Sequence, residues 1–217
     1  MSIPFEIFQP LLELAFIRHA FTLRTTEDTK ADHHPQRVLH SLGFSRFATA
    51  EQTHGNGVAV VTDSSNQLHL HPEDVRGEYF PGVDGLVTRA MDLPLVIRCA
   101  DCAGVFVVDR ATPAIALVHS GKRGTLANVI GNTMATMRET FGTDPRQCVA
   151  VISPSIGPCH YEMDIWGGIE QQLRDAGVGE IHNPRVCTAC HLDRYFSYRA
   201  EHSHTGRMFA VLALCAC

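Results

Sequence analysis

The sequence lacks several features that would mark a specialised class of protein. Only 19% of its residues are charged, the net charge is −5 with histidines neutral, and no dense basic run occurs. That composition gives nucleic-acid binding no support. No segment approaches about 20 uninterrupted apolar residues, which excludes a membrane-spanning helix. The sequence therefore predicts a protein that acts on neither nucleic acid nor membrane.

The N-terminal stretch also lacks the pattern of a secretory leader. It is apolar, but Glu6 and Glu13 interrupt it and no basic residue precedes them. A signal peptide combines a basic start with an uninterrupted apolar centre. We therefore expect a cytoplasmic protein, in which clustered cysteines indicate metal ligands or reactive thiols more often than disulfides.

Cysteine and histidine are abundant, with eight and thirteen copies in 217 residues. Some of the cysteines are expected to be core residues, because a free thiol packs well among apolar side chains. Cys148, which opens an apolar run, is predicted to be of that kind. The others are candidates for chemistry.

Runs that predict strands outnumber helical patterns. Helical spacing marks 35–42, 125–141 and 165–176, and a glycine follows each of them. Gly55-Asn56-Gly57 predicts a hairpin between two apolar runs, and SSNQLHLHPEDVRGEYFPG is typical of a loop. Strands are predicted at 14–24 (broken near His19), DGLVT, LPLVIRCAD, 104–109, 114–119, CVAVIS, YFSYR and RMFAVLALC. These patterns predict one α+β domain over residues 1–217, with mixed, largely antiparallel sheets.

The stretch CADCAGVFVVDRATPAIALVHSGKRGT suggests a metal site. If 104–109 and 114–119 pair as an antiparallel hairpin, Cys102 and His119 lie nearly opposite each other. Thiolate and imidazole are typical zinc ligands, and a third ligand would leave one position open for catalysis. The alternative is that Cys102 only fills the core and His119 is a surface histidine.

The segment after His119, SGKRGT, carries two basic residues directly before the expected helix. Lys122, Arg123 and the free amides of a helix start suit an anion such as phosphate. A Walker A loop is excluded because its spacing is missing. The alternative is a basic loop that is only solvated.

Several segments, taken in order, resemble the laccase-domain family: EQTHGNGV, DGLVT, CADCAGVFVVD, ALVHSGKRGT, ISPSIGPCHYEM, VCT and YFSYR…TGRM. Its members are described as multicopper polyphenol oxidases and as purine nucleoside phosphorylases with adenosine deaminase and methylthioadenosine phosphorylase activity. The resemblance implies a layered α/β sandwich. It implies a metal held by His54 of QTHG, Cys102 of ADC and His119 of HSGKRG.

The resemblance also suggests which residues act on substrate. Catalytic roles are expected for Cys102, His119 and Arg123. Substrate binding is expected for Arg24, Gln52, Lys122 and Arg123. The sequence departs from the family pattern where Lys122 replaces a usual tryptophan, Ser153 a usual glycine and His160 a frequent second cysteine, so the pocket is expected to differ in detail.

Other cysteines and histidines are predicted to hold no metal. Cys187-x-x-Cys190 invites a zinc site, but Cys215 and Cys217 are too closely spaced to supply its second pair. The pairs His69-x-His71 and His202-x-His204 are expected to be solvated loop residues. A multicopper oxidase would need richer histidine ligation than these pairs supply.

The function predicted from the sequence is a zinc-dependent purine nucleoside enzyme. It would use phosphate to cleave adenosine, inosine and methylthioadenosine, would also deaminate adenosine, and would be a monomer or homodimer. Three alternatives remain open: a copper-dependent, laccase-like polyphenol oxidase with Cu²⁺ in place of Zn²⁺, a metal-free Cys–His hydrolase that uses Cys102 and His119, and a non-catalytic metal-binding protein.

Overall fold

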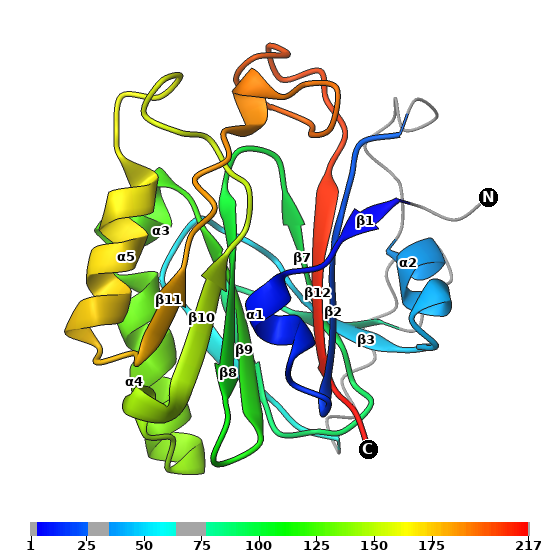
Figure 1. Ribbon diagram of the computed structural model, residues 1–217, viewed down its shortest axis with the longest axis vertical. Helices are drawn as coiled ribbons and strands as arrows, with labels where there is room; N and C mark the ends of the chain where they lie inside the picture. The colour runs from blue at the N-terminus through cyan, green and yellow to red at the C-terminus, as the bar shows by residue number, and fades with distance from the viewer. Residues whose placement is uncertain (1–3, 26–34, 64–76, 217) are drawn as a thin grey trace.

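Two mixed sheets of six strands each form the centre of the molecule (Figure 1). The computed structural model describes residues 4–25, 35–63 and 77–216. In spatial order, the first sheet contains β1 (Phe5–Glu6), β2 (Ile17–Thr22), β12 (Met208–Leu214), β7 (Leu95–Cys99), β3 (Phe47–Ala50) and β5 (Gly77–Phe80). The second contains β11 (Glu180–His182), β10 (Cys148–Ile152), β8 (Ala103–Asp109), β9 (Ala114–Ser120), β6 (Gly85–Thr88) and β4 (Val58–Val61).

The central strands of the second sheet are buried on both faces, which explains their continuous apolar sequence. Because side chains alternate along a strand, Phe106 and Leu117 point into the core between the two sheets. Val105 and Val118 point to the opposite face, where the helices pack. One sheet thus supports two separate cores.

Helices cover the outer faces of both sheets (Figure 1). On the second sheet lie α4 (Val129–Phe141) and α5 (Ile165–Asp175), whose apolar residues belong to the same cluster as the outer face of β8 and β9. On the first sheet lies α2 (Gln36–Ser41). The remaining short elements are α1 (Gln9–Leu12), α3 (Lys122–Leu126), η1 (Pro145–Gln147) and η2 (Thr188–Cys190).

The resulting order of helix, sheet, sheet and helix confirms the predicted α+β layered sandwich. Antiparallel pairings outnumber parallel ones, as expected. Cys148 is buried, as predicted. Among the described residues, no helix has the length and apolar character needed to cross a membrane.

The predicted hairpin at Gly55-Asn56-Gly57 is wrong. The strand before it, β3, belongs to the first sheet, and the strand after it, β4, belongs to the second. The glycine-rich turn therefore carries the chain from one layer to the other. A turn signal between two apolar runs does not distinguish these two outcomes.

Four other element predictions need correction. The expected helix 125–141 is two helices, because Asn128 adopts a left-handed conformation (φ 59°) and caps α4 by accepting from the Gly131 amide. His19 does not interrupt β2, since its ring is buried and accepts a hydrogen bond from the Phe8 amide. The segment YFSYR forms turns and not a strand. The segment SSNQLHLHPEDVRGEYFPG, expected to be a loop, includes β5 near its end. His69 and His71 lie outside the described residues.

Candidate metal centre and active-site cavity

Two of the candidate metal ligands lie on connections between the two sheets, and the third lies near the end of β9. The β7–β8 connection is at the upper end of Figure 1. His54 is in the turn from β3 to β4, and Cys102 is in the turn from β7 to β8. His119 is near the end of β9. Two connections and the end of one strand, from separate parts of the sequence, therefore meet at one edge of the sandwich.

The hairpin predicted for Cys102 and His119 is present. β8 pairs with β9 in the register Gly104 to His119 and Ala103 to Ser120, so Cys102 lies just beyond the last pair. The ligand atoms of His54, Cys102 and His119 all lie within 4.8 Å of one another. The structure thus brings together the three residues that the sequence suggested as metal ligands.

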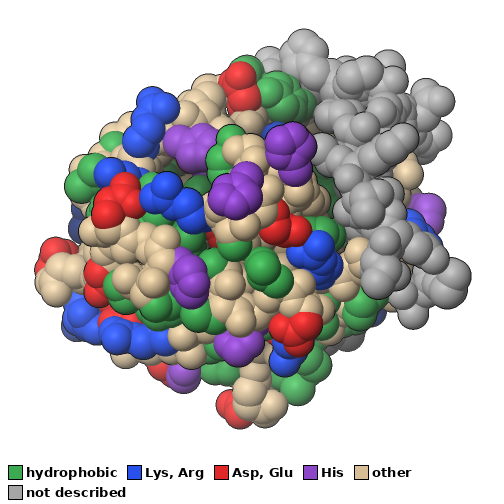
Figure 2. Space-filling model, turned by 90° about the horizontal axis from the view of Figure 1, so that it is seen from above, with side chains coloured by type: hydrophobic (Ala, Val, Ile, Leu, Met, Phe, Trp, Pro, Cys, Tyr) green, Lys and Arg blue, Asp and Glu red, His purple; other side chains and the backbone are tan. Residues whose placement is uncertain are grey.

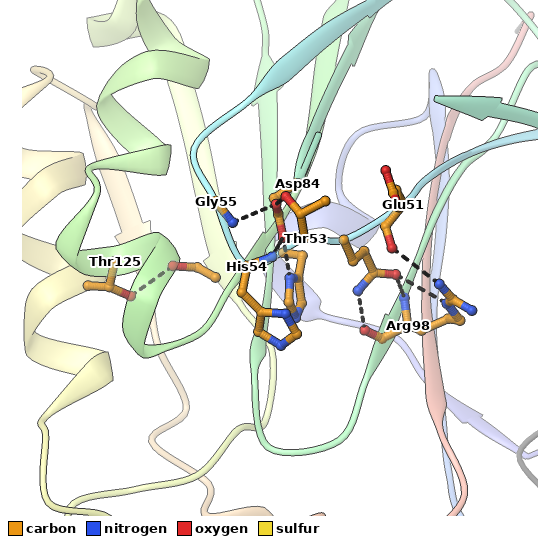
Figure 3. Close-up of polar contacts among 10 residues, drawn as sticks. Glu51, Thr53, His54, Gly55, Asp84, Arg98 and Thr125 are labelled. Atoms are coloured by element: carbon orange, nitrogen blue, oxygen red, sulfur yellow. Dashed lines mark hydrogen bonds and ion pairs between the residues drawn. The ribbon is translucent and has the colours of Figure 1, made fainter. Parts of the chain in front are cut away.

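Asp84 links this group through hydrogen bonds, and Figure 3 shows it beside Thr53, His54 and Gly55. Its carboxylate is fully buried and accepts four hydrogen bonds. Oδ1 accepts from the His54 amide at 2.9 Å and faces His119 Nδ1 at 2.8 Å. Oδ2 accepts from the Thr53 hydroxyl at 2.9 Å and the Gly55 amide at 2.8 Å. This pairing leaves His119 Nε2 available to a metal, which is how carboxylates orient metal-binding histidines.

The buried Asp84 carboxylate also stabilises a turn in which the backbone has an unfavourable conformation. His54 has a φ of 61°, a left-handed conformation that is uncommon for a residue with a side chain. The two hydrogen bonds from the amides of His54 and Gly55 fix that conformation. Burial alone would raise the pKa of Asp84, but hydrogen bonds from His119, Gly55 and Thr53 lower it.

Hydrogen bonds at the centre favour a thiolate at Cys102 and a protonated imidazole at His119. Burial would raise the pKa of Cys102, but hydrogen bonds with His119 and His54 lower it to about 6. Burial would lower the pKa of His119, but hydrogen bonds with Asp84 and Cys102 raise it to about 9. Without a metal, Cys102 is therefore a thiolate near neutral pH, the form that binds metals or attacks carbon.

Gly121 has no side chain, and the Cys102 thiol occupies the space where one would lie. A Cβ atom at this position would lie 2.5 Å from Cys102 Sγ and 3.7 Å from His54 Cδ2. No side chain fits there without displacing the sulfur. The glycine after Ser120 is thus part of the centre's geometry.

A cavity of about 950 Å³ opens beside the metal centre, within the size range of small-molecule sites. Its walls include the three candidate ligands and the rings of Tyr161 and Tyr198. Its basic residues are Arg98, Lys122, Arg123, Arg199 and Arg207. Figure 2 shows basic, acidic and histidine side chains gathered on this end of the molecule. The cavity can therefore accommodate an anionic or polar ligand with a ring system.

The two residues of the predicted anion cradle differ in the structure. Both belong to the first turn of α3 rather than preceding a helix, a correction that follows from the extra helix. Lys122 Nζ donates to Glu162 Oε1 at 2.9 Å, and Arg199 pairs with the other oxygen of Glu162 at 2.7 Å. Within the described residues Arg123 has no such partner, so its charge is available to a ligand.

Gln52 lines the cavity, but its side-chain amide is hydrogen-bonded to the backbone of Arg98. Its Nε2 donates to the Arg98 carbonyl at 2.7 Å, and its Oε1 accepts from the Arg98 amide at 2.8 Å. Substrate binding by Gln52 stays a prediction, and what the structure shows is a link between the β3–β4 turn and β7.

Arg24 is not among the residues that line the cavity in the described part of the chain. It pairs with Glu201 at 2.7 Å and lies over the ring of Phe196, 4.8 Å from its centroid. The structure therefore does not bring Arg24 together with the other predicted substrate-binding residues.

Sequence reasoning missed several residues of the site. Asp84 is part of the DGLVT segment, and a lone acidic residue directly before a strand was the available signal. Tyr161, Tyr198 and Arg207 lie in segments that resembled the family but had no assigned role. Only the folded arrangement of distant loops places them on one cavity.

The layered fold and the Cys/His₂ cluster define a laccase-domain protein with a candidate metal centre. The family described as multi-copper polyphenol oxidoreductase laccase matches residues 23–164 and 160–215. The chain belongs to this family.

Curated relatives of this chain are named for a different activity from the one in the family description. A purine nucleoside phosphorylase of Bacteroides thetaiotaomicron is 32% identical over 191 residues, which cover 73% of this chain and 70% of the relative. The purine nucleoside phosphorylase YlmD of Geobacillus stearothermophilus is 27% identical over 213 residues, covering 82% and 76%.

Solved structures agree on the fold. The hypothetical protein YfiH of Bacillus licheniformis superimposes with a TM-score of 0.85 at 22% identity, over 98% of this chain and 97% of that one. The structure of YlmD from Geobacillus stearothermophilus gives a TM-score of 0.85 at 21% identity, over 99% and 100%.

Proposed function

We propose that this protein is a zinc-dependent purine nucleoside phosphorylase that cleaves adenosine, inosine and methylthioadenosine and also deaminates adenosine. The observation that carries the proposal is the cluster of His54, Cys102 and His119 on the wall of a basic cavity. The names of the relatives support the same reaction class.

The residues of the centre suit zinc. One thiolate and two imidazoles are ligands that Zn²⁺ binds in catalytic sites, with a fourth position left open. Asp84 orients His119 for this role, and Gly121 leaves room for the sulfur. Zinc there would supply Lewis acidity and an acidified water for attack on the purine ring.

Phosphorolysis requires the protein to hold phosphate beside the ribose. A phosphate oxygen attacks C1′, the bond from C1′ to the base nitrogen breaks, and that nitrogen takes up a proton. Arg123 is the basic residue of the cavity that we assign to phosphate, since Lys122 and Arg199 already pair with Glu162. The guanidinium groups of Arg98 and Arg207 donate to neighbouring protein groups instead. A guanidinium holds phosphate with paired hydrogen bonds.

Copper is the first alternative metal, because the family description names copper oxidases. Two histidines and one cysteine also form the ligand set of blue-copper centres. A multicopper oxidase needs further histidine-rich centres, however. In the part of the chain that the structure describes, the second group of potential ligands contains a single histidine. The ligand chemistry therefore favours zinc at this centre over the copper sites of a multicopper oxidase.

A second candidate function is supported by a specific contact. Cys102, His119 and Asp84 form a thiol–imidazole–carboxylate series, in which Asp84 orients His119 through Nδ1. The same series activates the nucleophile of cysteine hydrolases. In that case the metal-free protein would be the active form.

Metal analysis and chelation distinguish these functions. Protein purified without added copper is expected to contain zinc and to release base from adenosine and inosine only with phosphate. Chelation should abolish turnover, and zinc should restore it. If the metal-free protein is fully active and alkylation of Cys102 destroys that activity, the protein is the hydrolase instead. Oxygen-dependent turnover of phenols would indicate the copper enzyme. Bound zinc without any turnover would indicate a non-catalytic protein.

A further inference from the structure

A second group of metal-binding atoms lies outside the cavity. The ligand atoms of Cys159, His160, Cys187 and Cys190 are all within 4.8 Å of one another. Cys187 is buried and the other three are exposed. The sequence predicted no metal at Cys187 and Cys190, because Cys215 and Cys217 are too closely spaced to supply a second pair of ligands. Cys215 instead packs in the core beneath α2, and Cys217 lies outside the described residues.

Four of the six distances between these atoms are close to the edges of a tetrahedron around zinc. With Zn–S near 2.3 Å and Zn–N near 2.0 Å, such edges are about 3.8 Å between sulfurs and about 3.5 Å between sulfur and nitrogen. Cys159 Sγ lies 3.6 Å from Cys190 Sγ. His160 Nδ1 lies 3.3, 3.5 and 3.8 Å from the sulfurs of Cys159, Cys190 and Cys187, in that order.

Backbone contacts hold the two contributing segments together without a metal. Ser155 and Cys187 form a parallel bridge, and the Thr188 amide donates to the Ser155 carbonyl. The Gly157 amide donates to Cys187 Sγ at 3.3 Å, which stabilises negative charge on that sulfur. The ligands are therefore brought close by the fold itself.

We propose that Cys159, His160, Cys187 and Cys190 bind a second zinc ion with a structural role. Four protein ligands fill the tetrahedron, so no position is left for water or substrate. Cys187-x-x-Cys190 has the spacing of one half of many structural zinc sites. This inference is independent of the proposed nucleoside chemistry.

The second site is connected to the cavity through Asp101, the residue before Cys102. Thr188, which lies between the two cysteines of the C-x-x-C pair, donates through its hydroxyl to Asp101 Oδ1 at 2.6 Å. Asp101 Oδ2 accepts from the Arg199 amide at 2.7 Å. A zinc ion here would fix the loops that carry Tyr161 and Arg199 into the cavity wall.

Zinc stoichiometry of the full chain tests the proposal. Protein purified under reducing conditions should contain close to two zinc ions per chain. Cys159→Ser/Cys190→Ser should contain one, and Cys102→Ala should lose the other. His191→Ala is the matched control, because its exposed imidazole follows Cys190 without belonging to the cluster. It should retain two.

Wild-type protein gives a second measurement if the double variant fails to fold. Zinc should protect Cys159 and Cys190 from iodoacetamide although both are exposed, and a chelator should remove that protection. The proposal is overturned by a single zinc that only Cys102→Ala removes. Alkylation unaffected by chelation, or a Cys159–Cys190 disulfide in reduced preparations, would also overturn it. None of these results would argue against zinc at Cys102, so failure of this proposal is distinguishable from failure of the proposed function.

Discussion

Asp84 acts on the metal centre through two of its candidate ligands, because its carboxylate contacts both His54 and His119. Each carboxylate oxygen accepts two hydrogen bonds, and together they fix the His119 ring and the backbone of His54. A buried carboxylate with all its acceptor positions filled cannot be replaced by a neutral group without losing some of these bonds. Asp84 is thus a positioning residue for both histidines.

Replacing Asp84 with Asn should weaken zinc binding by about 10–100-fold, the usual effect of removing a group that orients a metal ligand. The amide nitrogen of Asn would face two hydrogen-bond donors where the carboxylate oxygen accepts from both. Thr53→Ala is the control, because it removes one donor that does not touch His119. Competition with a chromophoric chelator measures both affinities. Equal affinity in Asp84→Asn and wild type would contradict the positioning role.

Arg123→Ala should lower phosphorolysis at least tenfold, mainly through a raised KM for phosphate, and leave zinc content unchanged. The reason is that Arg123 faces the cavity without a carboxylate partner in the described residues. Lys122→Ala is the comparison, since Lys122 already pairs with Glu162, and it should have the smaller effect. An unchanged phosphate dependence in Arg123→Ala would show that phosphate binds elsewhere.

Which site residues could be predicted depended on how local their contacts are. Cys102 and His119 follow from one hairpin of adjacent strands, so strand periodicity was sufficient. His54 needed a family motif, because it arrives from the other sheet. Cys159 and His160 could not be paired with Cys187 from spacing alone. A bridge between residues 155 and 187 joins them, and neither segment has a periodic pattern there.

At the scale of elements, β2 contains a buried titratable group with no role in the cavity. His19 is 5% exposed, and its Nε2 accepts from the Phe8 amide at 2.7 Å. Its ring stacks on Phe8 with centroids 5.8 Å apart. Burial lowers the pKa of His19 to about 4. This strand is therefore compatible only with neutral imidazole.

Acid should destabilise the protein through His19. The unfolded chain takes up the proton near pH 6.5 and the folded chain only near pH 4, so stability is present above pH 6.5 and falls as the pH drops to 4. The expected loss is about 3 kcal/mol. His19→Gln keeps an acceptor for Phe8 but does not titrate. Urea unfolding of both proteins from pH 7 to 4 should show the smaller loss in the variant, and parallel curves would refute the assignment.

The turn elements show why the fold could be predicted only in part. The hairpin of β8 and β9 has two continuous apolar runs and a short turn between them, and both are visible in the sequence. Gly55-Asn56-Gly57 offers the same signal, yet the strands beside it pair with distant partners, β4 with β6 and β3 with β7. Partner choice is a tertiary property, and turn chemistry does not determine it.

At the scale of the whole molecule, the candidate centre connects the two sheets. His54 and Cys102 each lie on a connection that leaves the first sheet and enters the second, and His119 belongs to the second sheet alone. A metal at this point crosslinks layers that otherwise meet through apolar contacts. Binding there should therefore stabilise the molecule as a unit and not one loop.

Zinc should consequently raise the temperature of a single unfolding transition. A ligand that binds only the folded state contributes about 4 kcal/mol at a thousandfold excess over its dissociation constant. For a chain of this size that corresponds to roughly 10 °C. Scanning calorimetry of chelated Cys159→Ser/Cys190→Ser protein, titrated with zinc, isolates the centre at Cys102. Magnesium at the same concentration should have no effect, because it prefers oxygen ligands. A melting temperature that zinc leaves unchanged would mean that the three residues bind no metal in the folded protein.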